Sequence, residues 1–347
     1  CWVWLRNPRA STARRVQLLT WVTLFLTFDL ILFGAFTRLT DSGLGCPDWP
    51  GCYGHASPVG AQQAIETAQT EMPTGPVTHT KAWIEMVHRY MATAVGGLIL
   101  TLASFAWWRK LRGDGVSDVA LPTFTLLWVC LQGAFGALTV TMKLFPLIVT
   151  LHLMGGLMLL VLLTVQVQRQ RLHSALATSV MVSPLLYRLV WLGLVLLSLQ
   201  VLLGGWVSTN YAVLACNTFP QCQGSWWPMM DFAQGFTLWR HLGMNALGEP
   251  LTFESLTAIH YAHRLAAYAV LAYLGVLAWQ LRRLAAYHSA SRALLAVLLL
   301  QLLTGLSNVV LDWPLVAAVL HTGGAAALLV ILVGLLSGAR VSRTVLN

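Results

Sequence analysis

Four histidines near the ends of long apolar segments are the side chains best suited to chemistry in this chain. They are His88, His152, His263 and His321. Ionisable side chains inside a membrane are costly and usually serve a function. Each half of the chain supplies two of them, from helices expected to run in the same direction and at similar depth. Two imidazoles that point into one bundle core can hold a haem iron from both faces.

Two other interpretations of these histidines stay open. Histidines can simply form hydrogen bonds between membrane helices, although four of them repeated two by two argue against that role. Zinc fits less well, because two histidines per half fall short of a tetrahedral site. Glycine pairs follow two of the histidines, at 155–156 and 323–324, and would let a helix backbone approach a flat porphyrin.

An acidic residue accompanies only one of the two histidine pairs. Glu85 lies three residues before His88 and so on the same helix face. The other half has His260 at the matching place. We hypothesise that one half does chemistry, with Glu85 as proton acceptor or electrostatic stabiliser, and that the other carries electrons. The alternative is that Glu85 only pairs with Arg89 or Lys81.

Three arginines are candidates for contacts with haem. Arg89 and Arg264 directly follow histidines, and Arg38 lies at the outer end of the first apolar segment. Each guanidinium could bind haem propionates through two parallel hydrogen bonds. The alternative is that these long side chains only reach from the helix end to the membrane surface.

Two cysteine pairs lie in the long loops that are expected outside the membrane. Cys46 and Cys52 enclose five residues, and so do Cys216 and Cys222. Because disulfides persist outside the cell, we predict one disulfide within each pair. A joint four-cysteine zinc site is the alternative, and a redox role in receiving electrons is also open.

The composition places these residues in a membrane protein. The chain is 57% hydrophobic and 10% charged, whereas soluble domains carry about 25% charge. Runs of about 20 apolar residues span a bilayer. We predict eight spans, at 16–37, 82–107, 119–142, 148–168, 187–209, 256–279, 293–311 and 315–337.

The net charge of +9 follows the topology rather than indicating nucleic-acid binding. Basic residues gather in five clusters that alternate with the apolar spans, at 6–15, 109–112, 169–188, 282–292 and 340–343. This pattern predicts that both termini are cytoplasmic and that the long loops 38–81 and 210–255 lie outside. The basic start followed by an apolar span predicts a first membrane helix rather than a signal peptide.

An internal repeat divides the chain. Gly34, Cys46 and Cys52 recur 170 positions later, and Gln132, Gly136 and His152 recur 169 positions later. We therefore expect an all-α membrane protein of two four-helix bundles, at 1–172 and 173–347. An even number of spans per half gives both halves one orientation, with a pseudo-twofold axis along the membrane normal.

At this point the motifs resemble a known family, the haem A synthases. The run Gly-Ala-Phe-Thr-Arg-Leu-Thr-Asp-Ser-Gly-Leu-Gly-Cys-Pro-Asp-Trp-Pro at 34–50 is similar to the family's first outer loop. Four further segments resemble the rest of its signature and cover nearly all eight spans: Glu85-Met-Val-His88-Arg89, Leu151-His152-Leu-Met-Gly-Gly, Ile259-His260-Tyr-Ala-His263-Arg264 and Leu320-His321-Thr-Gly-Gly.

The resemblance implies an oxidoreductase that converts a methyl group of haem O to the formyl group of haem A through hydroxylated intermediates, for terminal oxidases. It implies that His88 and His152 flank haem O beside Glu85, and that His263 and His321 ligate haem b. Arg38, Arg89, Arg264 and His260 are the candidates for contacts with these haems.

The resemblance also implies where the protein works and with what. Haem O synthase, oxidase assembly factors and an unidentified electron carrier are the expected partners, besides the lipid bilayer. The haem sites would face the outer side. The lack of an organelle-targeting segment favours a bacterial inner membrane as the location.

Two rival functions account for part of the sequence. A di-haem b-type cytochrome that carries electrons without substrate chemistry uses the same four histidines. It does not explain why Glu85 stands opposite His260. A transporter built from repeats would need polar residues or broken helices near the middle of the membrane, whereas most ionisable residues here lie at the outer ends.

Overall fold

A computed structural model describes residues 6–113, 118–174 and 178–341 of the chain. Within these residues, eight helices are long and apolar enough to cross a membrane. They are α2 (Thr12–Leu39), α4 (His79–Leu111), α5 (Ala120–Thr141), α6 (Pro146–His173), α7 (Pro184–Thr209), α9 (Phe253–Leu281), α10 (His288–Val310) and α11 (Leu315–Gly338). Each predicted span coincides with one of these helices, so the prediction of an all-α membrane protein is confirmed.

Several of these helices begin at residues that suit a first turn. The caps of α2, α4, α7 and α9 are Ser11, Thr78, Ser183 and Thr252. Each side-chain oxygen accepts a hydrogen bond from the backbone N–H three residues later, which satisfies a donor that a helix start otherwise leaves unpaired. Helix α6 starts instead with Pro146, whose missing N–H costs nothing at that position.

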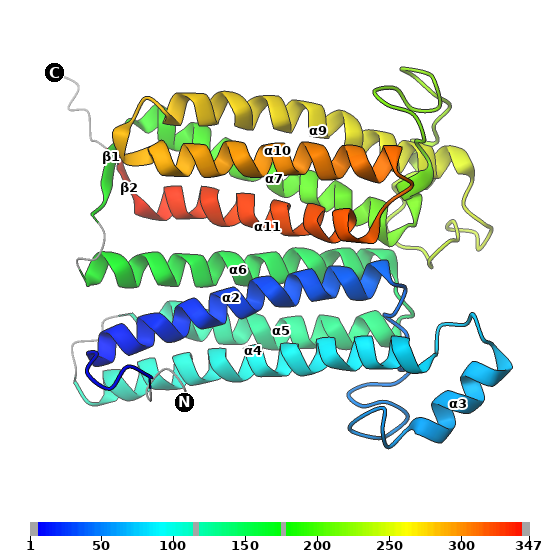
Figure 1. Cartoon of the computed structure of the whole chain (residues 1–347), viewed down its shortest axis with the longest axis horizontal. Helices are drawn as coiled ribbons and strands as arrows, with labels where there is room; N and C mark the ends of the chain where they lie inside the picture. Colours follow the sequence, from blue (N-terminus) through cyan, green and yellow to red (C-terminus); the bar gives the residue numbers. More distant parts are fainter. Residues whose placement is uncertain (1–5, 114–117, 175–177, 342–347) are drawn as a thin grey trace.

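The long helices form two groups of four. In the first group α2 and α5 each contact both α4 and α6, and in the second α7 and α10 each contact both α9 and α11. The groups meet where α11 packs against α2 and α6, and where α6 packs against α7 (Figure 1). Thr150 of α6 and Thr209 of α7 join their hydroxyls across this boundary at 3.1 Å.

Two contacts at this boundary join residues that match in the internal repeat. Arg38 donates a hydrogen bond to the carbonyl of Ser208 at 2.7 Å, and Tyr211 donates one to the carboxylate of Asp41. In each case the partners are 170 positions apart, which is the shift of the repeat. A residue that touches its own counterpart must lie beside the axis that relates the two halves. The pseudo-twofold relation stays a prediction, and these contacts support it.

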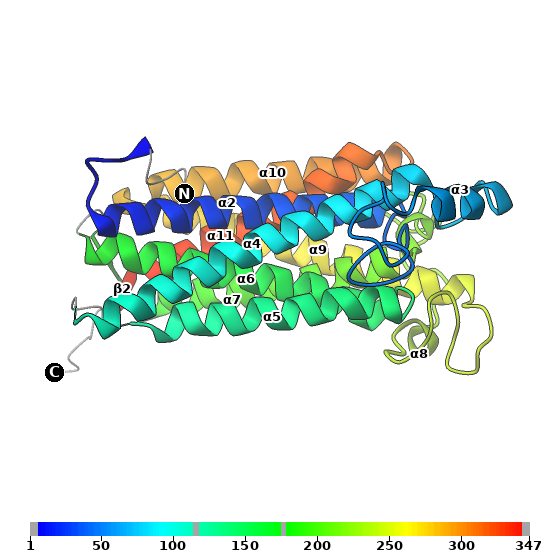
Figure 2. The same cartoon turned by 90° about the horizontal axis from the view of Figure 1, so that it is seen from below.

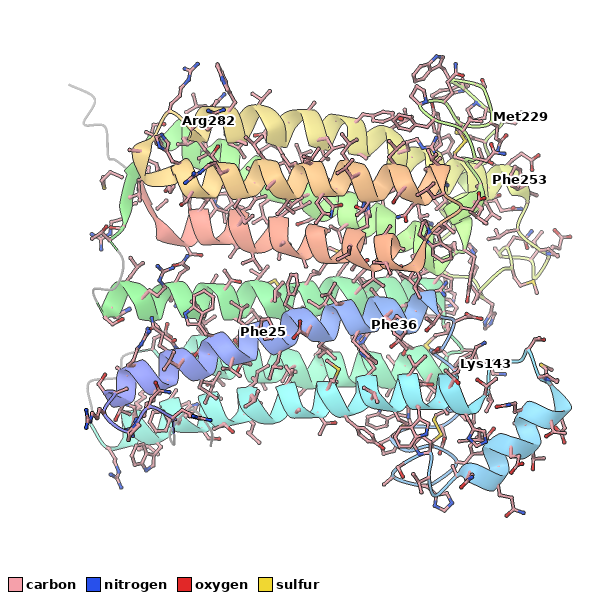
Figure 3. The ribbon with its side chains drawn as sticks, viewed as in Figure 1. Phe25, Phe36, Lys143, Met229, Phe253 and Arg282 are labelled. Carbon is pink, nitrogen blue, oxygen red and sulfur yellow. A yellow bond between two sulfur atoms is a disulfide. The ribbon has the colours of Figure 1, made fainter. Side chains whose placement is uncertain are left out.

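The two long loops project from one end of the bundle, which we call the loop end. They carry the short helices α3 (Gln62–Glu71), η1 (Ala212–Leu214) and α8 (Phe232–Gly235). Figure 2 shows α3 beyond the ends of the long helices, and the backbone N–H of Asp231, just before α8, donates to the carbonyl of Glu254 in the first turn of α9. Lys143, Met229 and Phe253 lie at the loop end, and Arg282 lies at the opposite end (Figure 3).

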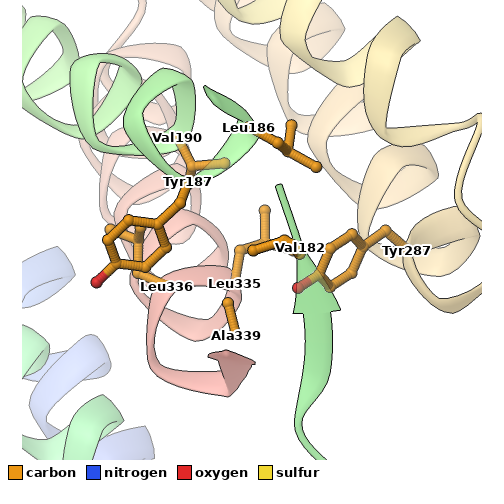
Figure 4. A pocket seen from close by; sticks show the side chains of 8 residues that line it. All are labelled: Val182, Leu186, Tyr187, Val190, Tyr287, Leu335, Leu336 and Ala339. Atoms are coloured by element: carbon orange, nitrogen blue, oxygen red, sulfur yellow. The ribbon is translucent and has the colours of Figure 1, made fainter. Parts of the chain in front are cut away.

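The opposite end holds the basic clusters and a small sheet. Strands β1 (Val180–Val182) and β2 (Ala339–Val341) pair in parallel, and η2 (Ala285–Tyr287) lies before α10. A narrow pocket next to β1 is lined by Val182, Tyr187, Tyr287 and Leu335, among other largely apolar residues (Figure 4). Of the basic residues that predicted the topology, Arg343 lies outside the described residues. The cytoplasmic position of this end stays a prediction.

A glycine sets the distance between α7 and α9. A Cβ at Gly193 would lie 3.1 Å from Leu274 and 3.2 Å from Leu277. We expect Gly193→Val to lower the free energy of unfolding by about 1–3 kcal/mol, because the added methyl groups overpack this contact. The thermal unfolding midpoint in detergent measures the effect.

Gly275→Val on α9 is the matched control, because a Cβ there meets nothing within 4 Å. It makes the same change in intrinsic helix propensity. An equal fall in both midpoints would contradict the close α7–α9 contact.

Candidate functional site

The four predicted histidines occupy the loop-end parts of four helices. His88 is in α4, His152 in α6, His263 in α9 and His321 in α11. His88 lies within electrostatic range of His152, and His263 within that of His321, so the four histidines form two pairs. Each pair lies within one half of the chain, and its role as a pair of haem ligands stays a prediction.

Each of these imidazoles packs against a glycine on a neighbouring helix. The glycines facing His88, His152, His263 and His321 are Gly34, Gly136, Gly204 and Gly305. A Cβ at these glycines would lie 3.0, 3.5, 2.9 and 3.2 Å from the ring Cε1 atoms, in the same order. Larger side chains would crowd at least three of the rings, so the repeated glycines provide the space that the imidazoles use.

Two of the glycines that follow His152 and His321 lie against a glutamine rather than against an imidazole. A Cβ at Gly155 or Gly324 would overlap the amide of Gln132 or Gln301. Gln301 donates a hydrogen bond to the backbone carbonyl of His321 at 2.7 Å. These glycines therefore let a glutamine lie against the helix that carries the histidine.

The ring nitrogens of the two pairs have different surroundings. Thr304 Oγ1 lies 3.0 Å from Nδ1 of His321, and Gln200 Nε2 lies 3.0 Å from Nδ1 of His263. Among the described residues, the buried Nδ1 atoms of His88 and His152 have no hydrogen-bond partner. Sequence reasoning missed Thr304 and Gln200, because neither belongs to the repeated motif.

Glu85 is buried beneath the first cysteine loop. Its side chain accepts a hydrogen bond from the backbone N–H of Cys46 at 2.8 Å and pairs with Arg89 at 2.5 Å. The predicted pairing with Arg89 is therefore present, whereas Lys81 lies 4.0 Å from the carboxylate of Asp41 instead. These contacts do not exclude a catalytic role for Glu85, which stays a hypothesis.

His260 has the equivalent structural position in the second half. Its Nδ1 lies 3.3 Å from the backbone nitrogen of Cys216, the counterpart of Cys46. Glu85 and His260 thus both provide an acceptor for the N–H of the first cysteine in their loops. The matching places of these residues in the repeat were a signal of this shared contact.

Arg89 and Arg264 support the cysteine loops from below. Arg89 donates to the carbonyls of Asp48 at 2.9 Å and Gly51 at 2.6 Å. Arg264 donates to several carbonyls of its own loop, including that of Cys216 at 2.9 Å. Neither sequence interpretation of these arginines included this role, and their contact with haem propionates stays a prediction.

Arg38 lies between the two halves rather than within one of them. Besides its bond to Ser208, its guanidinium is 4.0 Å from the centre of the Tyr211 ring and 3.8 Å from Asp41. A cation over an aromatic face is attracted to it, most strongly where water is excluded. Arg38 therefore helps to hold the two halves together at the loop end.

Both predicted disulfides are confirmed. Cys46 is bonded to Cys52, and Cys216 to Cys222. The alternative of a four-cysteine zinc site is therefore wrong, because all four thiols are consumed. Over the described ranges, no three His, Cys, Asp or Glu side chains are arranged to hold a metal ion by themselves, so zinc at the histidines has no support either.

Arg240 is a further buried residue that sequence reasoning missed. It is 3% exposed and donates a hydrogen bond to Oδ1 of Asn210 at 2.6 Å. It also donates to the backbone carbonyls of Thr237 and Met244, and its guanidinium lies 5.5 Å from the centre of the Trp206 ring. These contacts fasten the second long loop to the end of α7.

Comparison with known proteins agrees with this arrangement. A family model described as cytochrome oxidase assembly protein matches residues 17–333. A haem A synthase of Shewanella oneidensis is 40% identical over 318 residues, which cover 91% of this chain and 94% of that protein. Haem A synthases of a Bradyrhizobium strain and of Halalkalibacterium halodurans are 29% and 28% identical, covering 90% and 84% of this chain and 87% and 86% of their own length. The chain therefore belongs to the haem A synthase family of cytochrome oxidase assembly proteins.

Proposed function

We propose that this protein is a haem A synthase, an oxidoreductase that converts a methyl group of haem O to the formyl group of haem A. The observation that carries the proposal is the set of four histidines, held in two pairs at the loop end of a family member's membrane helices. Hydroxylated forms of the methyl group are the intermediates that such an oxidation requires.

The first half, residues 1–172, is the proposed substrate side. His88 and His152 would hold haem O between α4 and α6. Two features support this assignment: Glu85 lies one turn from His88 where the second half has His260, and the Nδ1 atoms of His88 and His152 lack partners among the described residues.

The second half, residues 173–347, is the proposed site of haem b. The residues present suit this group, because His263 and His321 offer two imidazoles and the hydroxyl of Thr304, which can accept a hydrogen bond, lies beside Nδ1 of His321. Metal-ligating histidines almost always have such a partner on the other ring nitrogen. When bound, haem b would supply a centre that accepts and passes on single electrons.

Glu85 would act as an electrostatic stabiliser or proton acceptor beside His88. It lies one helical turn from that histidine, on the same face of α4. Arg89 and the N–H of Cys46 hold its carboxylate in place. Because this carboxylate is 4% exposed, its charge acts in a site that largely excludes water.

We propose a bacterial inner membrane as the location, with both termini in the cytoplasm and the haem sites towards the outer face. The electron partner, haem O synthase and oxidase assembly factors are proposed partners. The di-haem cytochrome is the alternative that the first experiment below must separate from the synthase.

Extraction of haem from the purified protein tests the proposed reaction. In cells that also produce haem O, we expect haem A or its hydroxylated intermediate together with haem b, identified by chromatography with mass detection. Haem b alone at two per chain would support the electron carrier instead. Absence of any haem would contradict the assignment of the histidines as haem ligands and would favour the transporter hypothesis instead.

Replacement of Glu85 tests its role in the reaction. Glu85→Gln keeps an acceptor for the N–H of Cys46 but removes the negative charge, so we expect turnover of haem O to fall about a hundredfold. Asp48→Asn is the control, because the Asp48 carboxylate also supports this loop, through the N–H groups of Tyr53 and Gly54 at 2.6 and 2.7 Å.

The control variant Asp48→Asn should keep most of the turnover of the unaltered protein. If both variants lost turnover equally, Glu85 would matter only for the fold of the loop. If neither did, its proposed part in the chemistry would be wrong. Haem content of both proteins shows whether the site is still formed.

A further inference from the structure

The hydroxyl of Thr304 lies within hydrogen-bond distance of both a backbone carbonyl and a ring nitrogen of His321. Thr304 Oγ1 lies 2.7 Å from the carbonyl oxygen of Leu300 and 3.0 Å from Nδ1 of His321. A hydroxyl has one proton and two acceptor lone pairs. The carbonyl can only accept, so the hydroxyl proton points to Leu300, and Oγ1 accepts a hydrogen bond from Nδ1–H of His321.

This protonation leaves the other ring nitrogen of His321 ready for a metal. In a neutral imidazole with a proton on Nδ1, the lone pair is on Nε2. A hydrogen bond from Nδ1–H also fixes the ring orientation and makes Nε2 a stronger donor to iron. Gln301 holds the backbone carbonyl of the same residue at 2.7 Å.

Gln200 contacts His263 through a donor instead. Its Nε2 lies 3.0 Å from both Nδ1 and the backbone carbonyl of His263. Its Oε1 is buried and has no partner among the described residues. Because the NH2 group at Nε2 can only donate, Gln200 holds His263 in place but offers no acceptor to Nδ1–H.

The first half has no counterpart of either side chain. The repeat places Phe135 where the second half has Thr304, and Leu30 where it has Gln200. Neither replacement can form a side-chain hydrogen bond. Consistent with this, Nδ1 of His152 and of His88 are buried without a partner in the part of the chain that the structure describes.

We propose that Thr304 is a positioning residue that would make His321 a permanent ligand of a bound haem, and that the lack of such a partner would make His152 an exchangeable one. This inference rests on the proposed function and adds to it a reason for the division of labour. A substrate haem must enter and leave one half, whereas a resident haem must stay in the other. Each half offers a pair of histidines, and the halves differ in the side chains that contact those histidines.

The rate of haem release tests the proposal without measuring turnover. The purified protein carrying two haems per chain is mixed with excess apomyoglobin, which captures released haem. We expect a fast and a slow phase in the unaltered protein. Thr304→Val keeps the shape of the side chain but removes the hydroxyl, so the slow phase should accelerate about tenfold.

Two further variants separate positioning from general damage. Thr304→Ser restores a hydroxyl and should restore the slow phase. Thr322→Val makes the same change beside His321. Within the described residues the Thr322 hydroxyl donates to the carbonyl of Ala318, at 3.5 Å, and not to the ring of His321, so the slow phase should not change. The reduction potential of the slowly released haem should rise in Thr304→Val alone, because its ligand becomes a weaker donor.

Introduction of a hydroxyl at position 135 tests the role proposed for the first half. Phe135→Thr should slow the fast phase about tenfold, by giving Nδ1–H of His152 an acceptor. A single release phase in the unaltered protein, or an unchanged slow phase in Thr304→Val, would overturn the inference while leaving the proposed function intact. Failure of the unaltered protein to bind haem would instead overturn the proposed function.

Discussion

An imidazole between packed helices needs space that most side chains on the neighbouring helix would fill. This protein meets that requirement four times in the same way, with a glycine on the adjacent helix opposite each histidine. Close approach at small residues is also a common means of association between membrane helices. The same glycines therefore serve both the packing of the bundle and the placement of the imidazoles, and the site depends on them.

A second constraint comes from the cysteine loops, whose backbone groups would otherwise lie unpaired above the membrane helices. Unpaired backbone groups are costly wherever water is scarce. Arg89 and Arg264 satisfy carbonyls of these loops, and Glu85 and His260 face the N–H of the first cysteine. Because these residues flank the histidines on α4 and α9, the loop and the histidine of each half are held by the same helical turns.

The repeat duplicates this scaffold, and a few substitutions distinguish its copies. Glu85 stands opposite His260, and Phe135 opposite Thr304. Each exchange leaves the histidines in place but changes the charge or the hydrogen bonding beside them. A pair of equivalent sites can thus take different tasks without a change of fold, since the helices and their glycines stay the same.

The sequence by itself determined the membrane helices, the repeat and the two disulfides, because each follows from composition or spacing along the chain, and its motifs resembled those of the haem A synthase family. Its helix limits were several residues short in places: α4 runs over His79–Leu111 rather than 82–107, because polar and aromatic residues continue the helix beyond the apolar core. The sequence also suggested that Glu85 pairs with Arg89, since the two lie one turn apart. Only the tertiary structure decided what the arginines hold and which histidines have partners. Arg264 reaches a carbonyl 48 positions away, and Gln200 contacts a ring 63 positions away. Such contacts depend on how helices and loops pack in space, which no local pattern of residues records.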